Sequence, residues 1–425
     1  MRTEEIRKIV LDHRYKGIPL GVEIPLAELG AQGWNVARGE LSLPVTTLRA
    51  DALAHNIATF ASYCRRRGAE LAPHGKTSMS PQLFERQLEA GAWAITAATP
   101  GQAQIMRKFG VPRVMIANEV VEHAALQWIG AELEADPGFE LLCLVDSVAT
   151  VELMDAALRD VLSTRRLPVL LELGVSGGRT GVRTHEEAMA VAEAIGATST
   201  LALAGVETYE GLAASEASEQ ELKAVDALLD RVRVVVRDIA AANLFAPGEV
   251  LVTAGGSIHF DRVVDHLSGW PDSAVSPKLV LRSGCYVSHD SGRYHRLSPL
   301  DGRRSGDEPL ELRNALESWA TVLSRPEPGL VIAGAGKRDL PYDVEMPIPL
   351  RAHRRGGEVV SLEDCTVTKM MDQHAFLAVP PETDLAAGDI IVFGLSHPCA
   401  AFDKAPLLPL IDDDYTVVDG VVTFF

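Results

Sequence analysis

No stretch of this sequence stays apolar over the length of a membrane-spanning helix. Such a helix needs about 20 consecutive apolar residues, and every apolar run in the chain is interrupted well before that length. The opening residues, MRTEEIRKIVLDHRYKG, mix acidic and basic side chains and lack the apolar centre of an ordinary signal peptide. These absences predict a cytoplasmic protein that has no membrane partner.

Basic residues and cysteines are also scarce. The chain has 40 Lys and Arg residues against 58 Asp and Glu, a formal net charge of -18. Because phosphate backbones are bound by clustered Lys and Arg, we expect no nucleic-acid partner. The cysteines are odd in number, far apart and not preceded by an export signal, so we expect no disulfides. They are Cys64, Cys143, Cys285, Cys365 and Cys399.

The chain is long enough for two domains with sizeable cores. Its 425 residues are 47% hydrophobic and 23% charged, a composition typical of globular proteins. Domains average roughly 100 to 200 residues, and a single α/β barrel runs to about 250.

Short apolar runs alternate with helical patterns over the first two thirds of the chain. The eight runs are residues 71–76, 94–99, 113–118, 139–146, 168–174, 201–209, 249–256 and 279–287. Between them lie patterns such as SPQLFERQLEAG and SEQELKAVDALLDRV, which open on the N-cap candidates Ser80 and Ser218. Nearly continuous apolar strands that alternate with helices indicate a parallel sheet covered by helices. Eight such units predict an α/β domain, a (β/α)8 barrel over residues 45–290.

The pattern changes after residue 290. Loops rich in Pro, Gly and Arg are followed by alternating strands without helices, such as GDIIVFG and YTVVDGVVTFF. This pattern predicts a mostly antiparallel β domain over residues 291–425. We expect the N-terminal segment, residues 1–44, to pack against it.

Lys76 follows the first apolar run, in LAPHGKTSMSP. A polar residue at the end of a barrel strand lies at the carboxyl-end mouth, where barrel enzymes keep their catalytic groups. Position alone does not distinguish such a lysine from an ordinary surface lysine. A lysine that forms a Schiff base also needs a phosphate-binding loop and groups that hold the cofactor ring.

Two glycine-containing loops could supply the phosphate site. TAGGS and RSGCY end the seventh and eighth runs, and loops after strands 7 and 8 are the usual phosphate site of barrel enzymes. The alternative for each loop is a simple tight turn. The predicted phosphate-site residues are Gly255, Gly256, Ser257, Gly284, Cys285 and Tyr286.

Several motifs together resemble one family over nearly the whole chain. PHGKT, GGRTGV, ETYEG, AGGS, LRSGCYVSHD and SHPCAAFD are similar to motifs of D-serine dehydratases and D-threonine aldolases, which are fold-type III pyridoxal phosphate enzymes. The resemblance implies an alanine racemase-like barrel followed by a β domain, with Lys76 as the Schiff-base lysine and His74 beside the cofactor. It also implies that Arg179 and Tyr209 line the cofactor or substrate, and Asp290 follows the family's GxYxxxD pattern. Without the resemblance, Arg179 could simply pair with Glu172, and Tyr209 could be an ordinary half-buried aromatic residue.

His397 and Cys399 form an H-x-C pair in GLSHPCAAFD. If this segment is extended, the two side chains point to the same side, and imidazole with thiolate suits zinc. By itself such a pair is weak evidence, because such pairs usually have a structural role. The resemblance implies that the pair binds a metal, as in D-serine dehydratases. Related aldolases have Asp in place of the cysteine, which favours Mn²⁺ or Mg²⁺, so Cys399 favours Zn²⁺ and dehydration.

The function expected from these residues is metal-assisted deamination of a D-3-hydroxy amino acid such as D-serine, giving a 2-oxo acid and ammonia. The alternatives are aldolase-type cleavage of the same substrates, an amino acid racemase and a non-catalytic pyridoxal phosphate protein. The resemblance implies a homodimer. Two features depart from the family pattern: Ser78 and Met79 replace a histidine and a lysine, and Gln373–His374 replaces a Glu-His pair. His374 could assist the site or have a structural role.

Overall fold

The computed structural model describes residues 1–270, 275–303 and 309–425. The chain divides into two compact units. Unit 1 comprises Met1, Phe60–Lys76 and Gln87–Gly284, and unit 2 comprises Arg2–Thr59, Thr77–Arg86 and Cys285–Phe425. The chain thus passes from unit 1 to unit 2 directly after Lys76, and again directly after Gly284. Within the described residues, no helix is both long and apolar enough to cross a membrane.

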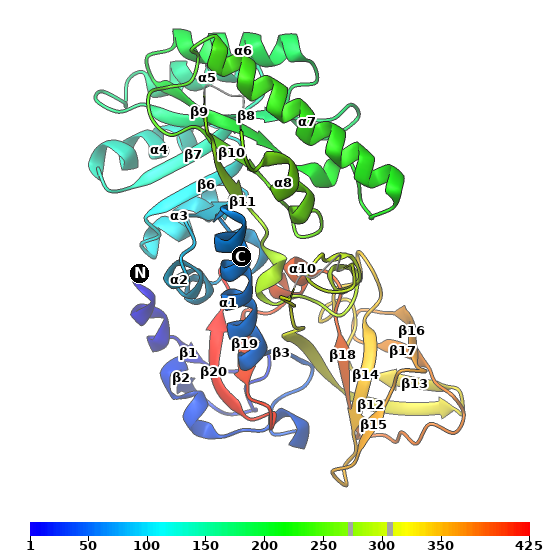
Figure 1. Cartoon of the computed structure of the whole chain (residues 1–425). Coiled ribbons are helices and arrows are strands. Elements are labelled where there is room, and N and C mark those ends of the chain that lie inside the picture. The colour runs from blue at the N-terminus through cyan, green and yellow to red at the C-terminus, as the bar shows by residue number, and fades with distance from the viewer. Residues whose placement is uncertain (271–274, 304–308) are drawn as a thin grey trace. The chain divides into compact units, whose positions relative to one another are not determined.

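Unit 1 contains an eight-stranded parallel sheet in the order β4-β11-β10-β9-β8-β7-β6-β5 (Figure 1). The strands are β4 (Glu70–Leu71), β5 (Ile95–Ala97), β6 (Arg113–Glu119), β7 (Glu140–Val145), β8 (Leu167–Leu173), β9 (Leu201–Thr208), β10 (Leu251–Ala254) and β11 (Lys278–Leu281). A parallel bridge between His74 and Thr96 joins the two ends of this sheet. Two backbone hydrogen bonds reinforce the junction, from Trp93 N to Leu71 O (2.7 Å) and from Thr96 N to Pro73 O (2.9 Å). The predicted eight strands and their closure into a barrel are confirmed.

Helices follow the barrel strands and cover the sheet (Figure 1). They are α3 (Pro100–Lys108), α4 (His123–Ala135), α5 (Val148–Leu158), α6 (His185–Ala197), α7 (Glu219–Ala241) and α8 (Phe260–Leu267). Ser218 caps α7 as predicted, because its hydroxyl accepts the Glu221 N–H. Ser80 lies at the predicted N-cap position, since its carbonyl accepts the Phe84 N–H (3.0 Å), but its side chain does not cap the helix that follows. The Ser80 hydroxyl precedes α2 (Pro81–Glu89) but is buried and has no hydrogen-bond partner among the described residues.

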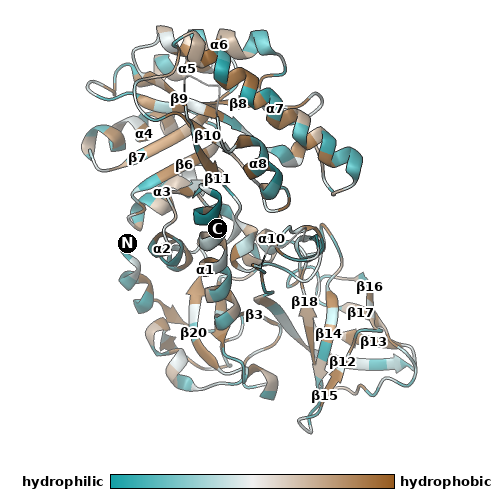
Figure 2. Cartoon of the chain, viewed as in Figure 1, coloured by the Kyte–Doolittle hydropathy of each residue, from teal (hydrophilic) through white to brown (hydrophobic). Residues whose placement is uncertain are grey.

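The barrel strands are apolar because both of their faces are buried. Figure 2 shows the strands of unit 1 mostly in brown, with teal residues concentrated on the helices. Burying a Leu or Val side chain stabilises the fold by roughly 1.5–3 kcal/mol. One buried cluster takes residues from seven of the strands or from the residues beside them. It consists of Ala72, Ala94, Met115, Leu142, Leu144, Leu170, Leu251 and Val280.

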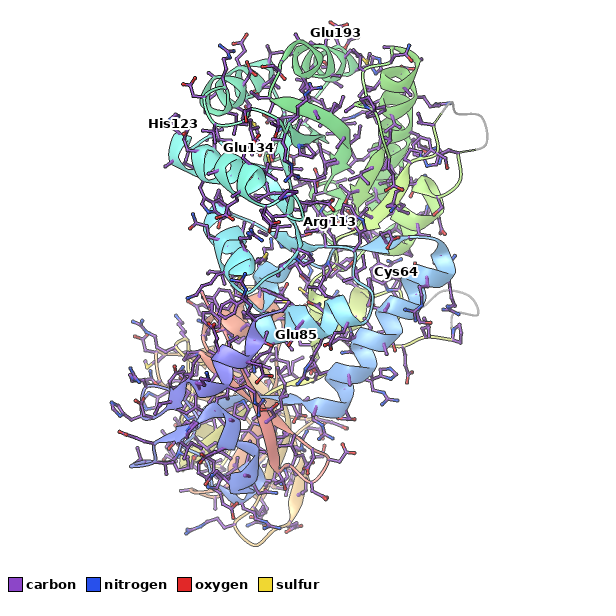
Figure 3. All side chains as sticks on the ribbon, turned by 90° about the vertical axis from the view of Figure 1, so that its left-hand side faces the viewer. Cys64, Glu85, Arg113, His123, Glu134 and Glu193 are labelled. Atoms are coloured by element: carbon purple, nitrogen blue, oxygen red, sulfur yellow. The ribbon has the colours of Figure 1, made fainter. Side chains whose placement is uncertain are left out.

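A carboxylate holds the loop that leads into β8. Glu134, near the end of α4 (Figure 3), accepts backbone N–H groups from Ser163 (2.9 Å), Thr164 (3.0 Å) and Arg165 (3.1 Å). These hydrogen bonds lower the pKa of Glu134 to about 2. The connection between α5 and β8 is therefore ordered by one side chain from α4.

Unit 2 is built on a mostly antiparallel sheet with the path β15-β14-β18-β12-β13-β17-β16, and β3 also pairs with β12. Its strands are β3 (Val45–Arg49), β12 (Leu316–Glu327), β13 (Leu330–Ala333), β14 (Ile348–His353), β15 (Val359–Ser361), β16 (Thr366–Met370), β17 (Ala375–Ala378), β18 (Ile390–Gly394), β19 (Leu407–Ile411) and β20 (Val417–Val422). The N-terminal segment packs against this sheet, because Val417 N donates to Trp34 O (2.8 Å). The mostly antiparallel fold predicted for the C-terminal part is confirmed.

Candidate active site

Lys76 lies in a 3₁₀ turn, Gly75–Thr77, that follows the first barrel strand, and its side chain is exposed. His74 lies two residues earlier in the bridge to Thr96. The His74 Nδ1 atom is buried and has no hydrogen-bond partner among the described residues. Burial, with the nearby positive charges of Lys76 and Arg282, lowers the pKa of His74 well below its usual value. His74 is therefore a neutral imidazole that has one nitrogen available to a ligand.

Gly255 and Gly256 present two backbone N–H groups to one anion. Both donate to the Glu210 carboxylate, over 3.0 Å from Gly255 N and 2.6 Å from Gly256 N. Gly255 has a φ of +92°, and a Cβ atom on Gly256 would lie 2.8 Å from Tyr209 Cε2. Glycine is therefore needed at both positions, at Gly255 for its left-handed backbone conformation and at Gly256 for the close approach of Tyr209. The arrangement binds an anion, and Glu210 is its occupant in this structure.

The loops after β10 and β11 are joined by a serine. Ser283 Oγ donates to Gly255 O (3.0 Å) and to Gly256 O (2.8 Å). Gly284 follows directly and is buried, whereas Ser257, after Gly256, is half-buried. The other two predicted phosphate-site residues, Cys285 and Tyr286, belong to unit 2, where both are buried in the 3₁₀ turn Cys285–Val287.

Arg179 and Tyr209 lie close together. The Arg179 guanidinium carbon is 5.7 Å from the centre of the Tyr209 ring. Arg179 Nη2 is also 3.9 Å from Glu172 Oε1, so the pairing considered as an alternative is present as well. The Tyr209 ring packs beside Gly256 and Gly211, since a Cβ on Gly211 would lie 2.5 Å from Tyr209 Oη.

Arg282 was not among the residues predicted from the sequence. It follows β11, is 6% exposed and donates to Thr253 Oγ1 (2.8 Å), Thr208 O (3.1 Å) and the Glu207 carboxylate. Glu207 is buried, and burial raises its pKa to about 8 despite the arginine. An arginine that ends the apolar run LVLR and a glutamate inside LALAGVETY were the available signals.

Glu119, which is half-buried, and Glu172, which is buried, form an acidic pair at the ends of β6 and β8. Neither Glu119 oxygen has a hydrogen-bond partner among the residues described. Burial and the adjacent Glu172 carboxylate raise the pKa of Glu119 to about 9. Glu119 is therefore protonated at neutral pH. This pair was also not predicted from the sequence, because Glu119 in NEV and Glu172 in ELG lie in no recognisable motif.

His397 and Cys399 lie in unit 2, and the expectation that their segment is extended is wrong. After β18 the chain turns into the short helix α10 (Pro398–Asp403), and His397 is its N-cap residue with a φ of 80°. Pro398 favours the helix because proline suits the first helical position. The two side chains nevertheless meet, since the Cys399 thiol, more than any other group, raises the pKa of His397 to about 9.

Two carboxylates hold His397. Its Nδ1 lies 2.5 Å from Asp343 Oδ2, which leaves Nε2 for a ligand. Metal-binding histidines commonly have such a carboxylate partner. Asp290 Oδ2 accepts the His397 backbone N–H (3.2 Å), and its Oδ1 accepts the His295 N–H (3.1 Å). Asp290 is thus a buried anchor for the backbone of His397.

Cys399 has two further neighbours in unit 2. Its Sγ lies 3.8 Å from Cys285 Sγ and 3.4 Å from Thr77 Oγ1. Contacts with Cys285, His397 and Thr77 lower the pKa of the Cys399 thiol well below its usual value. A thiolate is the form that binds metals. His374, by contrast, has an exposed side chain in the turn between β16 and β17.

Two protein-family models match the chain. The model described as "Alanine racemase, N-terminal domain" matches residues 48–248, and "Putative serine dehydratase domain" matches residues 315–411. The chain belongs to the D-serine dehydratase and D-threonine aldolase-like family. In this family, a 3-hydroxy-D-aspartate aldolase from Paracoccus denitrificans (strain Pd 1222) is 26% identical over 363 residues, 85% of this chain and 84% of that protein.

Two other relatives illustrate the range of the D-serine dehydratase and D-threonine aldolase-like family. A D-threo-3-hydroxyaspartate dehydratase from Delftia sp. (strain HT23) is 28% identical over 256 residues, 59% of this chain and 62% of that protein. The crystal structure of a D-threonine aldolase from Filomicrobium marinum superposes with a TM-score of 0.75 at 22% identity, over 92% of this chain and 96% of that one. The fold is thus shared by members with different names.

The residues at the carboxyl ends of the strands fit the cofactor that this family's barrel implies. Gly255 and Gly256 hold an anion through N–H groups where a Cβ would not fit. His74 offers a buried nitrogen without a partner. In unit 2, the imidazole of His397 and the thiolate of Cys399 are a donor set for zinc.

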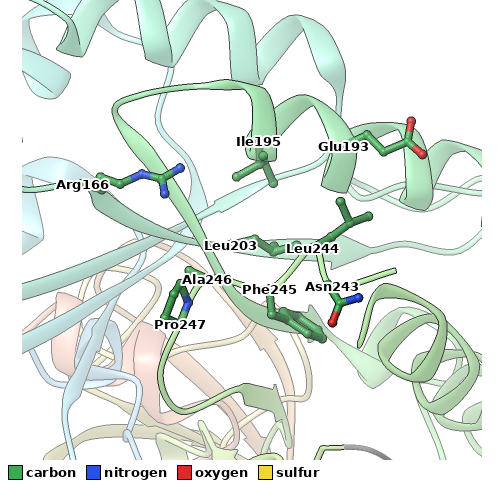
Figure 4. Close-up of a pocket in the computed structure, with 10 residues that line it drawn as sticks. Arg166, Glu193, Ile195, Leu203, Asn243, Leu244, Phe245, Ala246 and Pro247 are labelled. Atoms are coloured by element: carbon green, nitrogen blue, oxygen red, sulfur yellow. The ribbon is translucent and has the colours of Figure 1, made fainter. Parts of the chain in front are cut away.

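A pocket of about 390 Å³ in unit 1 lies elsewhere (Figure 4). Its lining includes Arg166, just before β8, and residues 243–247, which precede β10. These positions lie at the amino ends of the parallel strands. Barrel enzymes keep their chemistry at the carboxyl ends, so this pocket is not the candidate active site of the family's barrel.

Proposed function

We propose that this protein is a pyridoxal 5'-phosphate-dependent lyase that acts on D-3-hydroxy amino acids. The observation that carries the proposal is the pair of N–H groups at Gly255 and Gly256 that hold one anion in the same barrel as Lys76. The names of the relatives from Paracoccus and Delftia support the substrate class.

Pyridoxal phosphate, when bound, supplies an electron sink that makes the α-proton of an amino acid easier to remove. Lys76 Nζ binds the cofactor and afterwards takes the α-proton. The N–H groups of Gly255 and Gly256 bind the phosphate, which requires the Glu210 carboxylate to leave them. Neutral His74 and the Tyr209 ring orient the cofactor, and Arg179 binds the substrate carboxylate.

We further propose that His397 and Cys399 bind Zn²⁺ and that the reaction is dehydration. A metal ion stabilises a hydroxide as it leaves, and imidazole with thiolate selects zinc over Mn²⁺ or Mg²⁺. Asp343 holds Nδ1 of the His397 imidazole, so Nε2 would be the atom that binds the metal. Thr77, whose hydroxyl is close to Cys399, follows Lys76 directly in the chain. Water is lost and then regained, and the products are a 2-oxo acid and ammonia.

Aldolase cleavage is the second candidate, because the relative from Paracoccus, matched over 85% of this chain, is an aldolase. The two reactions differ in their products. Purified protein, reconstituted with pyridoxal phosphate and Zn²⁺, is to be offered D-serine, D-threonine, D-threo-3-hydroxyaspartate and their L forms. We expect 2-oxo acid and ammonia from the D forms. If the products are glycine and an aldehyde, with no 2-oxo acid, the reaction is aldolase cleavage and not dehydration.

The same samples test the remaining alternatives. A racemase would interconvert D- and L-serine and would retain activity after chelation, whereas the lyase should lose it. A protein that stays colourless with pyridoxal phosphate, and carries no adduct on Lys76 after borohydride reduction, would refute the proposal entirely. The homodimer remains a prediction, which light scattering of the loaded protein can check.

A further inference from the structure

A second group of metal-ligating side chains lies in unit 2, outside the residues assigned above. His289, His295 and Asp301 each place a ligand atom within 4.8 Å of those of the other two, and no other trio of His, Cys, Asp or Glu residues does so within the described ranges. His289 Nε2 is 2.8 Å and His295 Nδ1 is 2.7 Å from the same atom, Asp301 Oδ2.

The backbone holds these three side chains together. His289 is buried and has a φ of 51°, an unusual value for a residue other than glycine. Its N–H donates to Cys285 O over 2.8 Å. Backbone strain of this kind is retained where the surrounding structure requires it, often at ligand sites.

The loop that carries Asp301 folds back onto α9 (Arg293–Leu297). Asp301 N donates to Ser298 O (3.1 Å), and Gly302 N donates to His295 O (2.8 Å). A Cβ on Gly302 would lie 2.6 Å from His295 O, so only glycine allows this approach. The loop therefore presents Asp301 directly to His295.

One member of the trio is buried and the other two are partly exposed to solvent. The His289 side chain is 2% exposed, whereas Asp301 is 21% and His295 is 56% exposed. A carboxylate between two imidazoles could also be a plain hydrogen-bonded triad. Two imidazole nitrogens and a carboxylate oxygen are, however, three ligands of a tetrahedral zinc site, and the exposed side admits water as the fourth.

We propose that His289 Nε2, His295 Nδ1 and the Asp301 carboxylate form a second zinc-binding site, distinct from His397 and Cys399. It contains no thiolate, and its nitrogen ligands favour a transition metal over Ca²⁺ or Mg²⁺. The site ties α9 to the residues before and after it. Asp290, the neighbour of His289, accepts backbone N–H groups of both His295 and His397, so a metal here also braces the anchor of His397.

Metal binding to the full-length protein tests the proposal without any activity measurement. Chelated protein is titrated with Zn²⁺, and the bound metal is counted after dialysis. We expect two zinc ions per chain in the wild type, one in His295→Ala and one in the double variant His397→Ala, Cys399→Ala. The control is His185→Ala, which removes a half-buried histidine paired with one carboxylate, Asp238, and should leave the count unchanged.

Cobalt distinguishes the two sites. Only the His397–Cys399 site can give a thiolate-to-cobalt charge-transfer band. His295→Ala should therefore lose one cobalt ion and keep that band, while the double variant should lose the band and keep one ion. Asp301→Asn, which preserves the size of the side chain, should weaken binding at the thiolate-free site.

Thermal unfolding in chelator separates misfolding from loss of a ligand. Without metal, His295→Ala should melt at the same temperature as the wild type. Added zinc should raise the melting temperature of the wild type by more than it raises that of His295→Ala. If wild type and His295→Ala bind the same number of zinc ions, the trio is a hydrogen-bonded triad and the proposal fails. That result would leave the proposed lyase function untouched, since it concerns different residues.

Discussion

The two groups of candidate residues are positioned by different kinds of backbone. In unit 1, His74, Glu172, Glu207 and Arg282 lie in or just after parallel strands, and the common register brings their side chains to one end of the barrel. In unit 2, His397 is an N-cap residue in a left-handed conformation, held by Asp290 and Asp343. Regular parallel strands position the first group, whereas particular side-chain contacts position the second.

The largest expected effect is at Lys76. Lys76→Ala should lower kcat by at least about 1000-fold, about 4 kcal/mol of transition-state stabilisation. It should also abolish the borohydride-trapped cofactor adduct. The matched control is Lys278→Ala, at the opposite end of a barrel strand, where the lysine pairs with Glu249 (2.8 Å). Equal activity of the two variants would remove Lys76 from the mechanism.

The next effect concerns the metal pair in unit 2. Cys399→Ala removes one of two protein ligands, so we expect zinc affinity to fall by at least about 100-fold, about 2.7 kcal/mol. Competition with a coloured chelator measures this change. Cys365→Ser, a buried cysteine elsewhere in unit 2, is the control. If Cys399→Ala binds zinc as tightly as the wild type, Cys399 is not a zinc ligand.

A smaller effect is expected at the N–H pair in unit 1. Gly256→Ala would place a Cβ 2.8 Å from the Tyr209 ring and 3.2 Å from Glu210 Oε1. We expect pyridoxal phosphate affinity to fall about tenfold, which corresponds to about 1.4 kcal/mol. Fluorescence titration of the cofactor is the measurement. Gly196→Ala, on α6, where the nearest atom is 3.9 Å away, should bind the cofactor like the wild type.

The smallest effect is a pH dependence of stability from Glu119. Its pKa is about 9 in the folded protein, well above that of an unfolded glutamate, so the folded state binds one more proton between these values. Stability therefore falls as pH rises through this range. Glu119→Gln should remove this dependence and gain stability relative to wild type at pH 8 more than at pH 5. Urea unfolding at both pH values is the check, and parallel curves for the two proteins would contradict it.

Much of the barrel could be predicted from the sequence. The eight apolar runs appear as strands because each is buried on both faces, and position at a strand end directed attention to Lys76. Sequence did not identify Glu119, Glu207 or Arg282. Each follows or lies within an ordinary apolar run, and only the closed sheet brings these ionisable groups into a buried environment.

The sequence by itself determined the alternation of strands and helices, the change to an antiparallel β region after residue 290 and the residue types able to bind a cofactor or a metal. These follow from local periodicity and side-chain chemistry. Tertiary structure alone decided which groups meet: the Glu210 carboxylate at Gly255 and Gly256, Asp343 beside His397, and Asp301 between His289 and His295. Such contacts join side chains from separate turns and strand ends, and their geometry depends on how the intervening chain folds rather than on spacing in the sequence.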